Sequence, residues 1–172
     1  MFLNNIKRYI LKKKLKNNLC NVKPESLNSP IIRIGLIVDE SYFLETAALK
    51  QEIISNGIDE NNITVVVYRD NIKKKKVYSE STFGLKKLNF KGEFSEQFIK
   101  DFISEEFDLL INYYNIEKPI LLLLTHSSKA KFKVGFSTVD KRLNHFLINI
   151  VAENYKDFIS ELFRYLKILN KI

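Results

Sequence analysis

A chain of 172 residues, 45% of them hydrophobic, is long enough to bury one core, and its 5 glycines and 3 prolines are too few for a low-complexity chain. The single cysteine, Cys20, excludes an internal disulfide, and no Cys/His cluster has metal-ligand spacing, so we expect neither a metal nor a disulfide-linked partner. The formal net charge is +8, and residues 1–24 contain seven basic side chains and no acidic one.

The distribution of apolar residues predicts a soluble protein. No stretch approaches the roughly 18 unbroken apolar residues of a membrane span. The N-terminal segment lacks the apolar region of a signal peptide because lysines interrupt it. We therefore expect a cytoplasmic location, which one unpaired cysteine also fits.

Residues 1–24 are predicted to form a basic amphipathic arm. Leu3, Ile6 and Ile10 recur at offsets of three and four and define one helical face. Residues 25–30, rich in Ser, Asn and Pro, are predicted to be a linker, and residues 31–172 a single domain.

The domain alternates between strand-like and helix-like segments. Strands are predicted at 31–39, 63–69, 108–114, 119–124, 130–137 and 144–152, and helices at 40–57, 95–107 and 153–172. Ser41 is expected to cap the first of these helices and Gly57 to end it. Residues 71–92 have no strong period and suggest a short hairpin or an edge strand. The alternation predicts an α/β fold of three layers, with a mostly parallel central sheet and flanking helices, Rossmann-like in the loose sense, and leaves the strand order open.

The carboxyl ends of the predicted strands are the expected location of a ligand site. They contribute Asp39 and Glu40, Arg69 and Asp70, residues 112–114, and residues 125–128. If the last segment is an active site, His126 is its general acid or base, and Asp140 orients the imidazole. Ser127 and Ser128 then donate hydrogen bonds, and Lys129 and Lys131 hold an anion. The alternative is a turn whose small polar residues only satisfy its own backbone.

The segment "HSSKAKFKVG", residues 126–135, is similar to the His-x-Ser segment that follows a core strand in folate-dependent formyltransferases. That similarity implies a small transferase with Asp140 completing the site. The Asn that precedes the His by two residues in that family is Leu124 here, which removes an oxyanion-stabilising side chain.

The usual nucleotide-binding motifs are missing from the sequence. There is no GxGxxG, no GxxxxGK[ST] and no GxSxG, and "DESYF" after the first strand has no glycine. Asp39 and Glu40 also disfavour a phosphate at that turn. No cofactor is therefore predicted.

Three interpretations of the basic arm remain open. Its cations attract RNA phosphates or a ribosome-type particle, they attract an anionic membrane surface, or the apolar stripe docks the helix on the domain. The arm cations are Lys7, Arg8, Lys12, Lys13, Lys14 and Lys16. Lys129, Lys131 and Lys133 alternate with smaller or apolar residues, so an exposed strand would place all three on one face as a second contact. A solvent-exposed edge has the same pattern.

The segments "FDLLINYYN", "PILLLLTHSSKAKFKVGFSTVDKRLN" and "ENYKDFISELFRYLKILNKI" together resemble a family of small, uncharacterised Bacteroidetes proteins known as a domain of unknown function. The resemblance covers most of the chain and implies a bacterial cytoplasmic setting, with no activity to carry over. The sequence thus favours a non-catalytic module that binds an acidic macromolecule, RNA or a ribosome-type particle, through its basic arm. A transferase and a membrane-surface protein are its alternatives.

Overall fold

The computed structural model describes residues 2–22, 30–73, 76–89 and 91–172. Its centre is a six-stranded sheet in the order β3-β2-β1-β4-β5-β6, and every strand pairs parallel to its neighbour. The strands are β1 (Ile34–Asp39), β2 (Ile63–Tyr68), β3 (Ser81–Phe83), β4 (Leu109–Tyr113), β5 (Phe132–Phe136) and β6 (Phe146–Ile148). The predicted α/β class and parallel sheet are confirmed. Most of the predicted linker lies outside the described residues.

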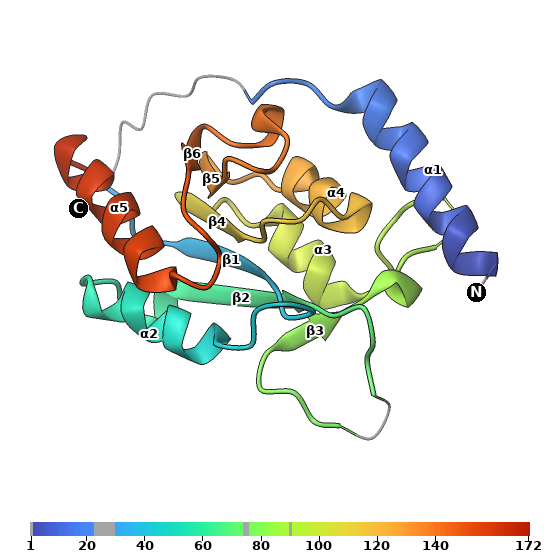
Figure 1. The fold of residues 1–172 in the computed structure, drawn as a ribbon, viewed down its shortest axis with the longest axis horizontal. Coiled ribbons are helices and arrows are strands. Elements are labelled where there is room, and N and C mark those ends of the chain that lie inside the picture. The colour runs from blue at the N-terminus through green and yellow to red at the C-terminus, as the bar shows by residue number, and fades with distance from the viewer. Residues whose placement is uncertain (1, 23–29, 74–75, 90) are drawn as a thin grey trace.

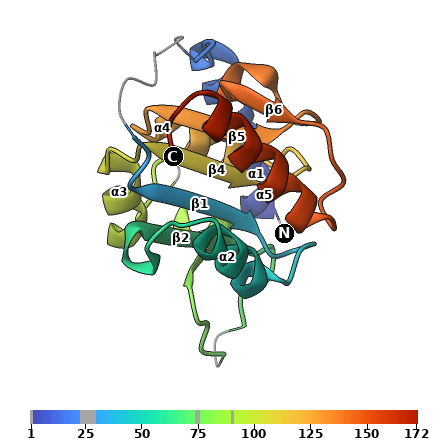
Figure 2. The same ribbon diagram turned by 90° about the vertical axis from the view of Figure 1, so that its left-hand side faces the viewer.

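In the described ranges, five α-helices cover the sheet in layers. They are α1 (Phe2–Asn18), α2 (Thr46–Ser55), α3 (Gln97–Ser104), α4 (Pro119–Ser127) and α5 (Tyr155–Ile168). α2 and α5 pack together on one face, α3 and α4 lie on the other, and α1 packs on α4 as an additional outer layer (Figure 1). Figure 2 shows α2 and α5 in front of the sheet, with α1 behind it.

One predicted strand, residues 119–124, is wrong, because this segment forms α4. Pro119 occupies the first turn of the helix, where a proline loses no hydrogen bond. Apolar residues occur on all sides of α4 because this helix lies between the sheet and α1. A helix that is buried on all sides shows no amphipathic period.

The strand predicted at 130–137 is present as β5, but its expected exposure is wrong. β5 pairs with β4 on one side and β6 on the other, and all five of its residues are buried. The unassigned region 71–92 contains the short edge strand β3. Helix α2 begins at Thr46 rather than near Ser41, and Gly57, at φ +98°, follows its end as expected.

The outer helix α1 is part of the hydrophobic core. Leu11 is 0% exposed, and Leu15 is also buried in the same cluster as the sheet residues. Two lysines add polar anchors: Lys7 donates to the carbonyl of Leu88, and the ammonium of Lys14 lies 3.1 Å from the carbonyl oxygen of Gly92. The arm therefore has the position that the third interpretation predicts, with its apolar stripe docked on the domain.

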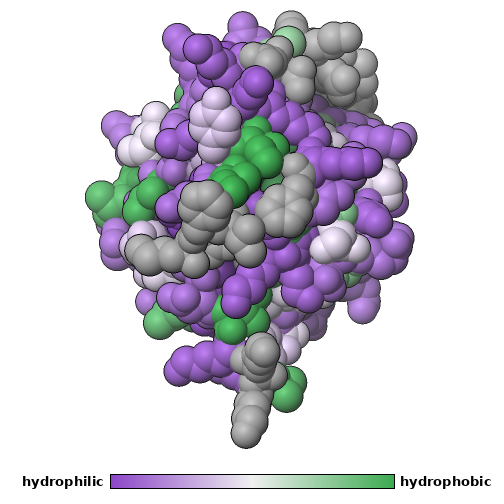
Figure 3. Space-filling view, turned by 90° about the vertical axis from the view of Figure 1, so that its right-hand side faces the viewer, coloured by the Kyte–Doolittle hydropathy of each residue, from purple (hydrophilic) through white to green (hydrophobic). Residues whose placement is uncertain are grey.

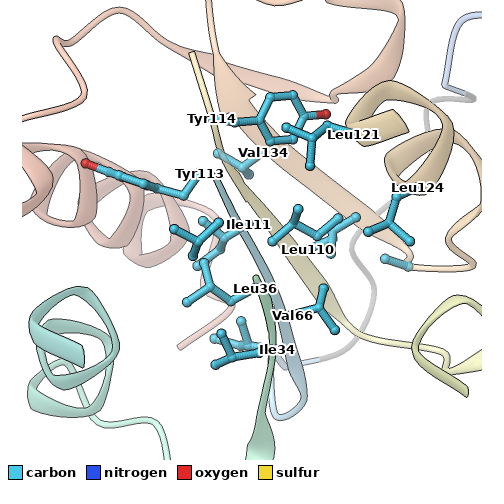
Figure 4. Packing of buried hydrophobic residues seen from close by; sticks show 14 of the residues in the cluster. Ile34, Leu36, Val66, Leu110, Ile111, Tyr113, Tyr114, Leu121, Leu124 and Val134 are labelled. Carbon is cyan, nitrogen blue, oxygen red and sulfur yellow. The ribbon is translucent and has the colours of Figure 1, made fainter. Parts of the chain in front are cut away.

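A chain of buried side-chain hydrogen bonds joins β4 to α4. The Asn112 amide donates to Asn144 Oδ1 at 2.7 Å, the Thr125 hydroxyl donates to Asn112 Oδ1 at 2.8 Å, and the Tyr114 hydroxyl lies 2.6 Å from that of Thr125. Tyr113 and Tyr114 leave β4 on opposite sides, with Tyr114 directed toward Leu121 of α4 (Figure 4). Thr125 is therefore a core residue rather than part of a surface turn.

Asp108, which directly precedes β4, connects this strand to the residues that precede β1 and β5. Its carboxylate accepts the amide of Arg33 at 2.9 Å and pairs with Lys131 at 2.8 Å. Burial opposes its ionisation, but these hydrogen bonds outweigh burial and lower the pKa of Asp108. A lowered folded-state pKa contributes stability above the unfolded value of about 3.9, and that contribution is lost as the pH falls through the folded value.

Replacing Asp108 with Asn should therefore cost stability at neutral pH and cost progressively less in acid. We expect the gap in unfolding free energy between wild type and Asp108→Asn to shrink as the pH falls below about 4. Urea unfolding over a pH series measures it. A gap that is constant with pH would mean that the charge of Asp108 plays no part.

Candidate functional site

The docked helix keeps four basic residues on the outside of the molecule. Arg8, Lys12, Lys13 and Lys16 are exposed, and we call them the basic face of α1. No ion pair joins any of them to a carboxylate within the described part of the chain. Figure 3 looks onto the side of the molecule that carries α1, and hydrophilic side chains cover most of it. Docking therefore uses Lys7 and Lys14 and leaves the other arm cations to solvent.

The segment around His126 lies at a different edge of the sheet from the one predicted. Because residues 119–127 form a helix that follows β4, His126 is in the last turn of α4, on the side of the sheet where β5 begins. The predicted position at the carboxyl edge is therefore wrong. Burial, and then the nearby Lys133 ammonium, lower the pKa of His126, so its imidazole is neutral at pH 7.

Only some of the predicted catalytic residues come together. His126 and Ser128 line a hollow of about 270 Å³ together with His145. Asp140 instead caps a short 3₁₀ helix and pairs with Arg142 at 2.6 Å, and no hydrogen bond joins it to His126 among the described residues. Ser127 does not line this hollow. The catalytic role of these residues stays a prediction.

The three lysines of residues 129–133 have three different environments. Lys133 is buried, and its ammonium lies 2.8 Å from the carbonyl oxygen of Thr125 and 2.7 Å from that of Ser128. It thus caps the carboxyl end of α4, where a cation also complements the helix dipole. Lys131 pairs with Asp108, and Lys129 is exposed. The predicted arrangement of all three on one solvent-facing strand is wrong, because β5 is an inner strand.

The carboxyl ends of β1 and β2 meet at a caged lysine. Lys118, which precedes α4, lies 2.7 Å from a carboxylate oxygen of Asp39 and 2.8 Å from one of Asp70. Its ammonium also lies 4.7 Å from the ring centres of both Tyr42 and Tyr68, which suits cation–π attraction. The Lys118 side chain is only 13% exposed. We call Lys118 and its four contacts, Asp39, Asp70, Tyr42 and Tyr68, the cage. The cage connects β1, β2 and the start of α4.

The protonation states of the cage follow from its contacts. The Tyr68 hydroxyl donates to Asp70 at 2.8 Å, and burial, then this bond, raise the pKa of Tyr68, so the phenol stays protonated. Burial opposes ionisation of Asp70, but hydrogen bonds from Lys118 and Tyr68 outweigh it and lower its pKa. Asp70 is therefore an ionised carboxylate that shares the Lys118 ammonium with Asp39.

A hollow of about 540 Å³ lies between α1 and this carboxyl edge. We call it the edge pocket, and its volume is within the roughly 300–1,000 Å³ typical of small-molecule sites. Its polar and aromatic lining includes Arg8, Tyr9, Lys12, Tyr42, Asp70, Glu117 and Lys118.

Sequence reasoning located part of this site and missed the rest. The ends of β1, β2 and β4 were expected at one edge, and their parallel pairing confirms it. Lys118 was missed because its neighbour Pro119 was assigned to a strand. Pro119 was the available signal, since a proline followed by a long apolar run also marks a helix start. Tyr9 and Tyr42 carried no signal, because exposure is decided by tertiary packing.

The fold defines the class of this protein: an all-parallel, doubly wound α/β protein with the strand order 3-2-1-4-5-6. More specifically, the chain belongs to the family described as "Family of unknown function (DUF6913)", whose model matches residues 7–169. The match includes most of α1 and confirms the resemblance to a domain of unknown function, while the Bacteroidetes origin stays a prediction. No curated protein and no solved structure matches the chain. No described helix has the length and apolar content that crossing a membrane requires.

Proposed function

We propose that this protein binds single-stranded RNA through the basic face of α1. The observation that carries the proposal is that Arg8, Lys12, Lys13 and Lys16 stay exposed, without a carboxylate partner among the described residues, on a helix that is anchored to the core. An anchored helix presents its charges at fixed positions, so less conformational entropy is lost on binding than with a free arm. An RNA partner agrees with the cytoplasmic, bacterial setting that the sequence resemblance implies.

Docking favours RNA over a membrane surface. A helix that lies in a membrane interface inserts an apolar face among the lipid chains. In α1 the apolar side chains Leu11 and Leu15 are buried against the rest of the protein. What α1 offers to a partner is charge, and neutralised phosphates release counterions, which makes binding strongly salt-dependent.

Charge reversal on this face should weaken RNA binding. The variant Lys13→Glu/Lys16→Glu changes two exposed positions of α1, and the second of them is in its last turn. We expect affinity for an oligoadenylate to fall about tenfold or more, and the slope of log K against log salt to decrease by about 1.4, because two phosphate contacts are lost. Fluorescence anisotropy over a salt series measures both.

The variant Lys156→Glu/Lys167→Glu is the matched control. It makes the same change of net charge at two exposed positions of α5, again with one in the last turn, on the opposite side of the sheet. We expect near wild-type binding from it. Equal losses in both variants would show a general charge effect and contradict a specific face. Point variants are preferable to deleting residues 1–24, because deletion would expose the apolar side of α4.

The same variants separate RNA from membrane binding. Sedimentation with liposomes of anionic phosphatidylserine, and with neutral phosphatidylcholine as a reference, is expected to leave the protein in the supernatant. Binding to anionic liposomes that is lost in Lys13→Glu/Lys16→Glu, without RNA binding, would favour the membrane alternative.

A further inference from the structure

The edge pocket combines aromatic rings with two cations, Arg8 and Lys12, that form no ion pair with a described carboxylate. Tyr9 is 68% exposed and Tyr42 is 64% exposed, and both line the pocket. Large aromatic side chains exposed within a concave site are typical of binding surfaces, because their ring faces are available for stacking. Arg8 and Lys12 are one helical turn apart on α1 and line the same pocket.

Acidic side chains also lie at this edge, and two of them share one cation. Asp39 and Asp70 both pair with the Lys118 ammonium, and Asp70 also accepts the Tyr68 hydroxyl. Glu117 is exposed, lines the pocket and forms no ion pair among the described residues. Lys118 also supports Tyr42, since its ammonium lies 4.7 Å from the centre of that ring. The cage therefore holds one aromatic wall in place and leaves the charges of Arg8 and Lys12 for a ligand.

The position of the pocket is also informative. In open α/β sheets, ligands lie outside the carboxyl ends of the strands. Nucleotide-binding proteins of this class hold the phosphate on a glycine-rich turn between the first strand and its helix. Here residues 40–45 contain no glycine, and Glu40 is occupied by Arg69 and by the Thr46 hydroxyl. The pocket-lining cations that form no ion pair among the described residues, Arg8 and Lys12, are on α1 instead.

We infer that the edge pocket binds one unpaired nucleotide, with the base stacked on Tyr9 and Tyr42 and the phosphate held by Arg8 and Lys12. The inference deepens the proposed function, on which it rests for the rest of the RNA strand. Both hydroxyl-bearing rings accept any base, because every base has a π-face, so the pocket selects single-stranded over paired nucleic acid rather than one sequence. The ligand's source is either a base within an RNA strand or a free mononucleotide.

Removal of the two rings tests this inference. The variant Tyr9→Ala/Tyr42→Ala is compared with Tyr9→Phe/Tyr42→Phe, which keeps the stacking faces. Three probes are titrated at moderate salt: an oligoadenylate, an abasic sugar-phosphate oligomer of equal length, and AMP. We expect the alanine pair to lose about tenfold or more in affinity for oligoadenylate. Binding of the abasic oligomer should be unchanged, and the phenylalanine pair should bind like wild type.

The arms of this experiment identify the source of the ligand. Saturable AMP binding that the alanine pair abolishes would support the pocket and show that a free nucleotide suffices. If the alanine pair loses affinity for oligoadenylate and the wild type does not bind AMP, the result would support the pocket as a site for a base within an RNA strand. The inferred nucleotide site would be overturned if the alanine pair bound oligoadenylate and AMP with wild-type affinity. It would also be overturned if the alanine pair lost as much affinity for the abasic oligomer as for oligoadenylate.

Failure of the pocket is distinguishable from failure of the proposed function. Lys13 and Lys16 do not line the edge pocket, so their reversal tests the basic face by itself. A wild-type protein that binds neither oligomer would overturn the RNA proposal, and the AMP titration would then decide the pocket independently.

Discussion

Replacing Lys118 with Met is expected to lower the free energy of unfolding by about 3–5 kcal/mol, because it leaves a buried carboxylate without its cation. Asp39 is 4% exposed, and Lys118 lies 2.7 Å from it. The ammonium also pairs with Asp70 and contacts the rings of Tyr42 and Tyr68, so one substitution removes the centre of the cage. Urea unfolding of the variant, monitored by circular dichroism, measures the loss.

Two controls show whether burial causes the effect. The variant Lys87→Met breaks the more exposed ion pair with Glu96, and we expect it to cost less than about 1 kcal/mol. The double variant Lys118→Met/Asp39→Asn removes the more buried of the two carboxylates that lose their cation, and it should recover part of the stability. A cost for Lys118→Met as small as that for Lys87→Met would contradict the cage as a structural centre.

Replacing Leu11 with Ala is expected to cost about 2–5 kcal/mol of unfolding free energy, in the range of buried leucines. Leu11 is fully buried in the core cluster and helps to hold α1 on the domain. The loss should appear in the urea midpoint and in faster amide exchange along α1. Weaker oligoadenylate binding is also expected, since Arg8, Tyr9 and Lys12 would no longer be held at the edge pocket.

Lys13→Ala is the matched control for Leu11→Ala, because it changes an exposed position of the same helix to the same residue. Its effect should lie within about 0.5 kcal/mol of zero. If Leu11→Ala were equally neutral, and the amides of α1 exchanged at the rate of an unfolded peptide, α1 would not be docked in solution.

The elements that the sequence predicted correctly have patterns that local physics explains. Residues 31–39, 63–69 and 108–114 are β-branched or leucine-rich runs of strand length, and they form β1, β2 and β4. The amphipathic period of residues 153–172 forms α5. Segment 119–124 failed because a short apolar run has the same pattern whether it is a buried strand or a buried helix. That single error moved His126 from one edge of the sheet to the other.

The candidate site depended more on tertiary structure than the fold did. Lys118, Asp39 and Asp70 are far apart in the chain, and no spacing rule connects them. Lys133 had the alternation of a surface strand, but its neighbours on both sides made it a buried cap of α4. Whether a lysine attracts RNA or holds a helix end is decided by which elements surround it.

By itself, the sequence determined the α/β class, the presence of most strands and helices, and the concentration of positive charge in residues 1–24. These are properties of composition and of periods within single segments, which short-range forces control. Only the tertiary structure decided the strand order, the docking of α1, and which cations remain exposed. Those features arise from packing between segments distant in the chain, and burial of Leu11 and Leu15 determines the face that α1 presents to a partner.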